Sequence, residues 1–242
     1  MFWLIEQVKE IAKFTDLEIL ASFVAASVHD FRHPGVNSNF LMNTLDVMAI
    51  RFNCISVLES MHASESLLAL RRPENNFFEN HSNKEFLEFH ELVVQLVLAT
   101  DMAKHISILG DFTAKIAACG GINWSNTADR HLALRMFIKM ADLSNPTREL
   151  SIYREWTEQL LKEFFAQGDR EKAEGLPISP FMDRGSCNVA KMQTTFLSMV
   201  IKPLVLSIIK IVPTATELLT NVETNIGSWK MPPSPTSKPS VL

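Results

Sequence analysis

The sequence predicts an all-α fold, and three observations carry that prediction. Apolar residues recur at helical spacing in several stretches, and three sequences that match a capping box stand directly before such stretches. No stretch alternates apolar and polar residues with the period of two that a half-buried strand requires. The chain has 242 residues, 47% of them hydrophobic, so it can bury one sizeable core and is expected to form a compact multi-helix domain.

The first half of the chain contains three expected helices. The first begins at a capping box that starts at Thr15, and it ends near Pro34 because proline cannot continue a helix. Residues 57–70 form the second helix, and the third follows a capping box that starts at Ser82. Residues 1–13 interrupt their apolar side chains with charges, so they are not a signal peptide, and we set them apart as a divergent N-terminal segment.

Further helices are expected in the second half. One covers residues 130–141, and another covers 149–167 and stops at Gly168. A capping box that starts at Thr214 opens a short C-terminal helix, and the proline- and serine-rich residues 229–242 are expected to be disordered. The apolar residues of the 149–167 helix are Ile152, Trp156, Leu160, Phe164 and Phe165.

Charge and cysteine content limit the classes of function. The chain has 23 Lys and Arg against 27 Asp and Glu, which argues against a nucleic-acid binder, a class that usually carries a basic patch. Three cysteines stand far apart and in no CxxC pattern, so they predict no disulfide framework and fit a reducing, cytoplasmic location. The most apolar stretch, 199–212, is interrupted by Lys202, Pro203 and Lys210 and is shorter than the ~20 apolar residues of a bilayer span. We therefore expect neither nucleic acid nor a membrane span.

A first polar cluster, HDFRHPG at residues 29–35, stands near the end of an expected helix. Adjacent His29 and Asp30 can both turn toward one metal ion, since imidazole and carboxylate suit zinc and related divalent ions. His33 would lie about one turn beyond His29 if the helix persisted that far. Taken alone, the cluster is compatible with a metal site but does not establish one.

Two further clusters each allow a structural and a functional interpretation. Asp142, in KMADLSNP, is either a turn former at a helix end or a ligand held inside the bundle. Gln193 and Phe196 share one helix face, where an amide can bind a purine edge while the ring stacks on the purine. The alternative is a surface glutamine beside a core phenylalanine.

Several strings stand in a fixed order along most of the chain, from about Phe14 to about Val212: FTDLEILASFVAASVHDFRHPG, VLES, LATDMAKH, MADLSNPT, YREWT, EFFAQGDRE and PISPFMD. In this order they resemble the catalytic domain of the class I cyclic nucleotide phosphodiesterases. FTDLEILA, LATDM, ADLSNPT and QGDRE are most similar to the cAMP-specific class. Residues 14–228 are accordingly assigned to a partial, N-terminally truncated phosphodiesterase catalytic domain of the HD type.

The resemblance implies hydrolysis of the 3′,5′-cyclic phosphodiester of cAMP or cGMP to the 5′-monophosphate, which ends cyclic nucleotide signalling. It also implies two divalent ions, Zn²⁺ at the tighter site and Mg²⁺ or Mn²⁺ at the second, with His29 and Asp30 on the tighter ion and Asp142 bridging both. Hydrolysis would then use a hydroxide between ions ~3.5–4 Å apart, where a water is deprotonated near neutral pH. Positions that orient the waters and ligands match His33, Glu59, His62 and Asp101.

By the same resemblance, purine recognition maps onto Gln193, with Phe196 as one face of a hydrophobic clamp and Leu160 as the opposite face. The glutamine amide can rotate to suit adenine or guanine, so its presence alone does not select between them. Asn145 favours cAMP. Other positions of the pocket match Met102, Trp156 and Phe164.

The sequence also departs from the family's pattern. The family's first motif, His-Asn-x-x-His, has no counterpart here, because the first histidine of this sequence is His29. That motif supplies the proton donor to the leaving 3′ oxygen and one metal ligand, so no catalytic proton donor can be identified.

Three functions therefore stay open. The first is cyclic nucleotide hydrolysis with cAMP favoured, and the second is a catalytically impaired form that binds a nucleotide or a partner without turnover. The third is another HD-type metal phosphohydrolase acting on nucleotides, which the His-Asp pair alone permits. Missing N-terminal helices would leave apolar faces exposed, and two copies of the chain would cover such faces by pairing. A homodimer is therefore one expected state.

Overall fold

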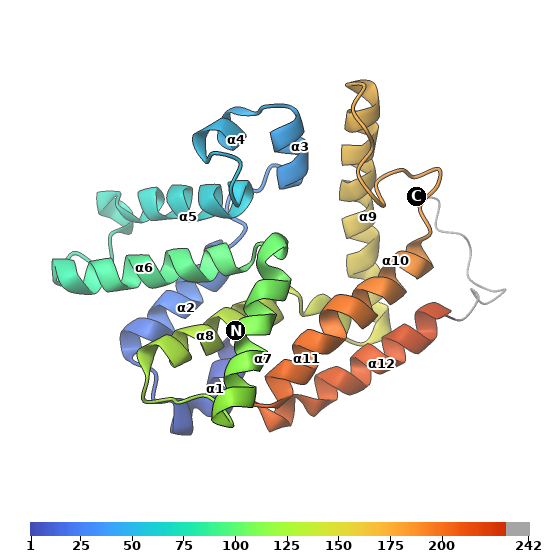
Figure 1. The fold of residues 1–242 in the computed structure, drawn as a ribbon. Helices are drawn as coiled ribbons and strands as arrows, with labels where there is room; N and C mark the ends of the chain where they lie inside the picture. The colour runs from blue at the N-terminus through green and yellow to red at the C-terminus, as the bar shows by residue number, and fades with distance from the viewer. Residues whose placement is uncertain (231–242) are drawn as a thin grey trace. The chain divides into compact units, whose positions relative to one another are not determined.

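Every regular element in residues 1–230 is helical, and these are the residues that the computed structural model describes (Figure 1). The all-α prediction is therefore confirmed. The chain divides into two units: the first contains Met1–Asp142 and Ser207–Thr214, and the second contains Leu143–Leu206 and residues 215–230.

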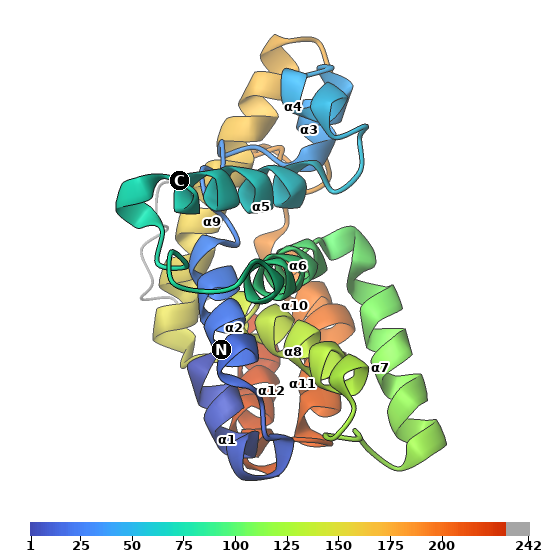
Figure 2. The same ribbon diagram turned by 90° about the vertical axis from the view of Figure 1, so that its left-hand side faces the viewer.

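The first unit is a layered set of helices around α6. Its α2 and α5 pack against α6, which packs in turn against α8, and α7 packs against α8 (Figure 2). Phe89, Leu96, Phe112 and Phe137 are fully buried in this unit. Its helices are α1 (Phe2–Ala12), α2 (Asp16–Val28), α3 (Ser38–Asn43), α4 (Val47–Arg51), α5 (Val57–Leu70), α6 (Asn83–Ala99), α7 (His105–Cys119) and α8 (Thr127–Asp142), with short 3₁₀ turns η1 (Pro73–Asn75) and η2 (Met102–Lys104).

Two of the three predicted capping boxes form as expected. Thr15 accepts a hydrogen bond from the backbone of Glu18 at 3.1 Å, and Glu18 accepts one from the backbone of Thr15 at 2.9 Å. Ser82 and its partner three residues on make the same reciprocal pair at the start of α6. At the third sequence, Thr214 lies in the 3₁₀ turn η5 (Pro213–Ala215), and its hydroxyl donates to Gln7 at 2.8 Å.

The end of α2 differs from the prediction in a way that matters for the site. The helix ends at Val28, not near Pro34. Arg32 takes a left-handed conformation, with φ 63°, and His33 directly precedes Pro34, a position that is disfavoured in the helical region. His29 is the C-cap residue of α2 and keeps helical dihedral angles, whereas Asp30 lies in the turn that follows.

The second unit is built on the long helix α9. The buried face of α9 carries Leu161 and Phe165, which pack with Met192 of α10, and α10 packs against α12. Helix α12 includes Trp229 and Lys230, which the sequence placed in the tail; residues 231–242 lie outside the described range. The elements of this unit are η3 (Asn145–Thr147), α9 (Leu150–Ala173), α10 (Val189–Phe196), the π-helical turn η4 (Leu197–Ile201), α11 (Lys202–Ile209, whose last residues belong to the first unit) and α12 (Thr216–Lys230).

The predicted stop of α9 at Gly168 is wrong, because the helix continues to Ala173. A Cβ on Gly168 would lie 1.9 Å from the backbone carbonyl oxygen of Met182. The glycine therefore allows the following loop to pack closely against the helix, and it does not terminate the helix.

One apolar helical stretch is longer than the sequence indicated. Residues Val189–Ile209 run without interruption through η4, with a mean hydropathy of 1.5, and by length and composition alone this stretch is long enough to cross a membrane. The bent pair Asn83–Ala99 and Met102–Cys119 passes the same test as one broken span. Leu197, Ile201 and Val205 are fully buried, as in the core helix of a soluble protein, so the stretch is weak support for a span. The expected absence of a membrane span stays a prediction.

Candidate metal centre and nucleotide-binding residues

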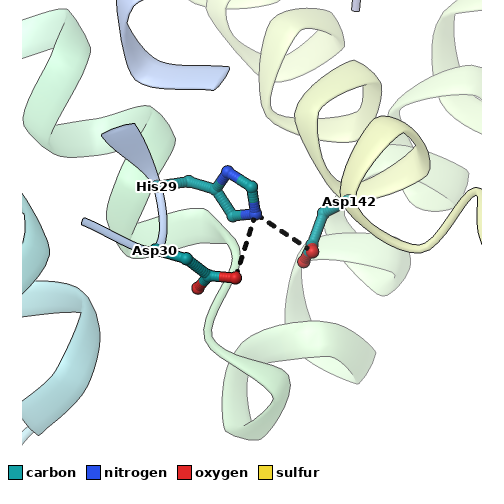
Figure 3. Close-up of side chains that lie close together, drawn as sticks. All are labelled: His29, Asp30 and Asp142. Carbon is teal, nitrogen blue, oxygen red and sulfur yellow. Dashed lines mark ion pairs between the residues drawn. The ribbon is translucent and has the colours of Figure 1, made fainter. Parts of the chain in front are cut away.

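Three potential metal ligands meet in the first unit (Figure 3). His29 and Asp30 come from the turn after α2, and Asp142 is the last residue of α8. The Nε2 atom of His29 lies 3.4 Å from a carboxylate oxygen of Asp30 and 3.3 Å from one of Asp142. One donor atom from each residue lies within 4.8 Å of the other two. The structure thus brings together the three residues that the resemblance assigned to metal binding.

The orientation of His29 fits a metal ligand. Its Nδ1 atom lies 2.9 Å from the carbonyl oxygen of Ala26, and an N–H at that position leaves Nε2 directed toward the two carboxylates. The hydrogen bond with Asp142 raises the pKa of His29 to about 9, against the effect of burial. A divalent ion would have to displace that proton. Imidazole and two carboxylates are a suitable donor set for Zn²⁺ or a related ion.

Two further histidines border this group. The Nδ1 atom of His62, which is buried on α5, lies 2.7 Å from the carbonyl oxygen of Phe31, and its Nε2 atom lies 3.7 Å from Asp30. His33 stacks on His62 with ring centroids 5.7 Å apart, and its Nδ1 accepts a hydrogen bond from the backbone of Gly35. Because Nδ1 donates to Phe31 and burial lowers the pKa of His62, its Nε2 has no proton for Asp30, and His62 borders that carboxylate without a hydrogen bond to it. His33 contacts the site through its stacking on His62.

Two more carboxylates lie near the three ligands. Glu59 stands one turn before His62 on α5, and one of its carboxylate oxygens is buried without a hydrogen-bond partner among the described residues. Burial raises the pKa of Glu59, and the nearby carboxylates of Asp101 and Asp30 raise it further. Asp101 accepts hydrogen bonds from Ser56 at 2.7 Å and from the backbone of Ala103 at 2.8 Å. A buried oxygen without a partner is the kind of group that an ion or its bound water would satisfy.

In the second unit, Gln193 is buried on α10 and faces α9. Its amide oxygen accepts a hydrogen bond from the hydroxyl of Tyr153, which is also buried. Burial excludes the alternative of a surface glutamine. The amide nitrogen and the second lone pair of the oxygen remain for a ligand.

The apolar residues of α9 lie on two faces, one buried and one partly open to solvent. The buried row consists of Tyr153, Thr157, Leu161 and Phe165. The row that precedes it by one residue is open to solvent: Trp156 is 54% exposed and Leu160 is 42% exposed, while Phe164 is half-buried. Side chains of the exposed row are available to contact a ligand.

The remaining predicted pocket residues lie in different elements. Asn145 begins the turn η3, and this turn is held by α12, because Asn225 donates to the carbonyl oxygens of Pro146 and Arg148 at 3.0 and 2.9 Å. Phe196, the last residue of α10, is half-buried. Met102 belongs to the first unit, where it begins η2 and is exposed.

Comparison with known proteins decides the family. A match to the family described as 3′5′-cyclic nucleotide phosphodiesterase covers residues 1–222. The chain belongs to this family. The resemblance found in the ordered strings is thereby confirmed.

Relatives of the phosphodiesterase family match nearly the whole chain. The probable 3′,5′-cyclic phosphodiesterase pde-3 of Caenorhabditis elegans is 40% identical over 226 residues, which make up 90% of this chain and 33% of that protein. The 3′,5′-cyclic-AMP phosphodiesterases 4C of Rattus norvegicus and Mus musculus are each 40% identical over 237 residues, or 96% of this chain, and the matches cover 44% and 34% of those proteins. The chain therefore spans between a third and a half of the length of these relatives.

Sequence reasoning gave no role to three residues that support the candidate site. Ser56 binds Asp101, Tyr153 binds Gln193, and Lys139 is buried next to the acidic residues of the metal centre. Ser56 and Tyr153 pair with residues 40 or more positions away, which no local pattern reveals. Lys139 did leave a signal, because it is a lone charge inside the apolar run Met136–Met140.

Proposed function

We propose that this chain hydrolyses 3′,5′-cyclic nucleotides, with cAMP as the preferred substrate, to 5′-monophosphates, and so ends a cyclic nucleotide signal. Membership of the phosphodiesterase family supports the reaction class. The observation that carries the proposal is the convergence of His29, Asp30 and Asp142, whose donor atoms lie within 4.8 Å of one another.

Divalent metal ions complete the proposal. His29 and Asp30 would hold the tighter ion, for which Zn²⁺ suits the donors, and Asp142 would be shared with a second ion, Mg²⁺ or Mn²⁺. When bound, such ions lower the pKa of a water and neutralise charge on phosphoryl oxygens. Glu59 and Asp101 would accept hydrogen bonds from waters at the site, and the unprotonated Nε2 of His62 would accept one from a water beside Asp30.

Nucleotide recognition is assigned to the second unit. Gln193 would bind the purine edge through the amide atoms that Tyr153 leaves unused, and Phe196 with Leu160 would contact the purine faces. Preference for cAMP is supported by the names of two relatives, which are cyclic-AMP phosphodiesterases. Asn145, anchored through its turn by Asn225, is the residue that we assign to this preference.

The test is conversion of cAMP to AMP by the purified chain with Mg²⁺ or Mn²⁺, followed by chromatography. Asp142→Ala should abolish turnover, because it removes the ligand shared by both ions. Asp111→Ala, which removes an exposed carboxylate on α7, should leave turnover unchanged. Well-folded protein that binds metal and has no activity toward either cAMP or cGMP would contradict the proposal.

A second function is motivated by one observation. Residues 1–28 contain no histidine, and a site that works without a general acid typically loses ~10²–10⁴-fold in rate. The chain would then bind cyclic nucleotide or AMP without turning it over. Calorimetric binding of cAMP with no AMP formed over hours would favour this function. Appreciable turnover would exclude it.

The sequence also left a homodimer and a cytoplasmic location as predictions. Light scattering over a range of protein concentrations would measure the first, and imaging of the tagged protein in cells would measure the second.

A further inference from the structure

Lys139 is one of the largest fully buried side chains of the described chain. It is 1% exposed, in the middle of α8, among the apolar side chains of that helix. Lysine is rarely buried to this degree without a partner, because removing an ammonium from water is costly. Its surroundings therefore need to supply compensating groups.

The ammonium is held at the C-terminal end of α6. It donates a hydrogen bond to the carbonyl oxygen of Ala99 at 2.8 Å and lies 3.5 Å from the carbonyl oxygen of Asp101. Carbonyls at a helix C-terminus lack partners within the helix and carry partial negative charge, so a cation is favoured there. Lys139 thus ties α8 to the turn that presents Asp101.

The carboxylates of Asp142, Asp101 and Glu59 act on Lys139, and together with Asp30, the neighbour of Asp142 in the metal centre, we call them the acidic cluster. Asp142 lies three residues after Lys139 on the same helix face. Burial lowers the pKa of Lys139, and the carboxylates of Asp142, Asp101 and Glu59 oppose that shift.

The neighbouring basic side chain does not share this role. His105 is buried beside Lys139, and neither of its ring nitrogens has a hydrogen-bond partner in the described chain. Burial, together with the charge of Lys139, lowers the pKa of His105, so the imidazole is neutral. On the α8 side of the acidic cluster the positive charge therefore resides on Lys139. Elsewhere around the cluster, Lys104 acts on Glu59. His29 lies 3.4 Å from Asp30 and 3.3 Å from Asp142.

We infer that Lys139 is a buried counter-ion of the acidic cluster. Its ammonium holds the Asp101 turn in place, and its positive charge weakens the binding of divalent cations to the cluster. The inference rests on the metal centre of the proposed function and adds a determinant of its ion affinity. Its ammonium binds backbone carbonyl oxygens at the end of α6, so Lys139 acts as a positioning residue.

The direction in which Lys139 changes the affinity for a divalent ion follows from charge alone. A fixed positive charge repels an incoming divalent ion, and the same charge stabilises the cluster when no ion is bound. Removing it should tighten ion binding and make the metal-free protein less stable. A residue that only filled space would change stability without tightening the binding of an ion.

The experiment measures Mn²⁺ affinity of the whole chain by calorimetry, and thermal unfolding in EDTA and in excess Mn²⁺. Lys139→Gln keeps a hydrogen-bond donor and removes the charge, and Lys139→Met removes both. Each should bind Mn²⁺ roughly tenfold more tightly than the unaltered chain, the size expected when one unit charge near a divalent ion is removed. Excess Mn²⁺ should also raise the Tm of each variant by more than it raises the Tm of the unaltered chain.

Two controls isolate the charge of Lys139. Lys139→Arg keeps the charge and should leave Mn²⁺ affinity unchanged. Lys84→Gln removes an exposed lysine from the start of α6, and it should also have no effect. If Lys139→Met does not fold, Lys139→Gln and Lys139→Arg still give the comparison.

The outcomes separate the two proposals. Equal or weaker Mn²⁺ binding by the neutral variants, with the unaltered chain binding normally, would overturn the counter-ion inference and leave the metal centre intact. Absence of Mn²⁺ binding to the unaltered chain would overturn the metal centre and this inference with it.

Discussion

Leu45 has a backbone conformation that leucine seldom takes. Its φ is 51°, and its side chain is 69% exposed between α3 and α4. The left-handed conformation costs roughly 1–2 kcal/mol for a residue with a Cβ, whereas glycine adopts it freely. We expect Leu45→Gly to raise the free energy of unfolding by up to about 1 kcal/mol, after the larger entropy of glycine in the unfolded chain is allowed for. Urea denaturation would measure the change.

A matched control is Leu68→Gly. Leu68 is 62% exposed, like Leu45, but it lies in the interior of α5 with helical geometry. The same substitution should lower stability there by about 1 kcal/mol. Equal effects of the two substitutions would show that backbone conformation at Leu45 does not decide the result.

Glu18 is a residue whose titration should be visible in stability. Burial alone would raise its pKa, but hydrogen bonds from His131, Arg130 and the backbone of Thr15 lower it from the ordinary 4.5 to about 2. Because the pKa is lower in the folded state, the stabilisation is fully present above pH 4.5 and is lost as the pH falls toward 2. The loss is up to about 3 kcal/mol.

Unfolding measured at successive pH values with Glu18→Gln tests this. The variant should be less stable than the unaltered chain at pH 7 and should show a flatter decline between pH 4.5 and 2. Glu163→Gln, which alters an exposed position on α9, should retain the steep decline. Parallel curves for Glu18→Gln and the unaltered chain would contradict the assignment.

At the scale of elements, α9 and the loop of residues 176–188 form one closely fitted piece. Glu171 of α9 is buried and accepts hydrogen bonds from the backbone and the hydroxyl of Ser179, both at 2.6 Å. Gly168 lets the carbonyl of Met182 approach the helix where a side chain would otherwise stand. At the surface, Arg184 forms an ion pair with Asp169 at 2.5 Å.

Gly168→Ala should separate this loop from α9. The added methyl group would lie 1.9 Å from the carbonyl oxygen of Met182, so the loop backbone must move, at a cost of roughly 1–3 kcal/mol. We expect faster cleavage by trypsin after Arg184 and a lower Tm.

Gly110→Ala is the matching change in α7. A Cβ on Gly110 meets no atom within 4 Å, so the substitution should stabilise the protein by up to about 1 kcal/mol. Unchanged cleavage of Gly168→Ala at Arg184 would show that the contact with Met182 does not hold the loop.

The elements also show what the sequence could and could not specify. The starts of α2 and α6 were predictable because a capping box is a local signal that contains both of its partners. The end of α2 was not, because it depends on the left-handed turn at Arg32. The course of α9 past Gly168 was not predictable either, because it depends on Met182, which meets the glycine only after the loop folds back.

At the scale of the molecule, the two halves of the proposed activity belong to separate units. The ligands of the metal centre lie in the first unit, and Gln193 and Phe196 lie in the second. His29, Asp30 and Asp142 lie within the ordered strings, whereas Gln193 and Phe196 were indicated by their shared helix face and by the family resemblance. The partners of Lys139 and Tyr153 became visible only from contacts between segments far apart in the sequence.

Hydrogen exchange should therefore give two separable footprints. Mn²⁺ should protect amides around His29, Asp101 and Asp142, while adenosine, which has no phosphate to bind a metal, should protect amides of α9 and α10. Gln193→Ala should remove the adenosine footprint and leave that of Mn²⁺. Protection by Mn²⁺ confined to α9 and α10 would contradict the assignment of the metal ligands.

The metal ligands also bear on the conformational entropy of the unfolded chain. Asp30 and Asp142 stand at the two ends of most of the first unit's sequence, so an ion shared by the two residues would close a loop of more than a hundred residues. Closure of so long a loop restricts the unfolded ensemble in the way that a covalent crosslink does, with the difference that a chelator can undo it. We expect the bound ion to act as a reversible crosslink, and its removal by a chelator to lower the free energy of unfolding.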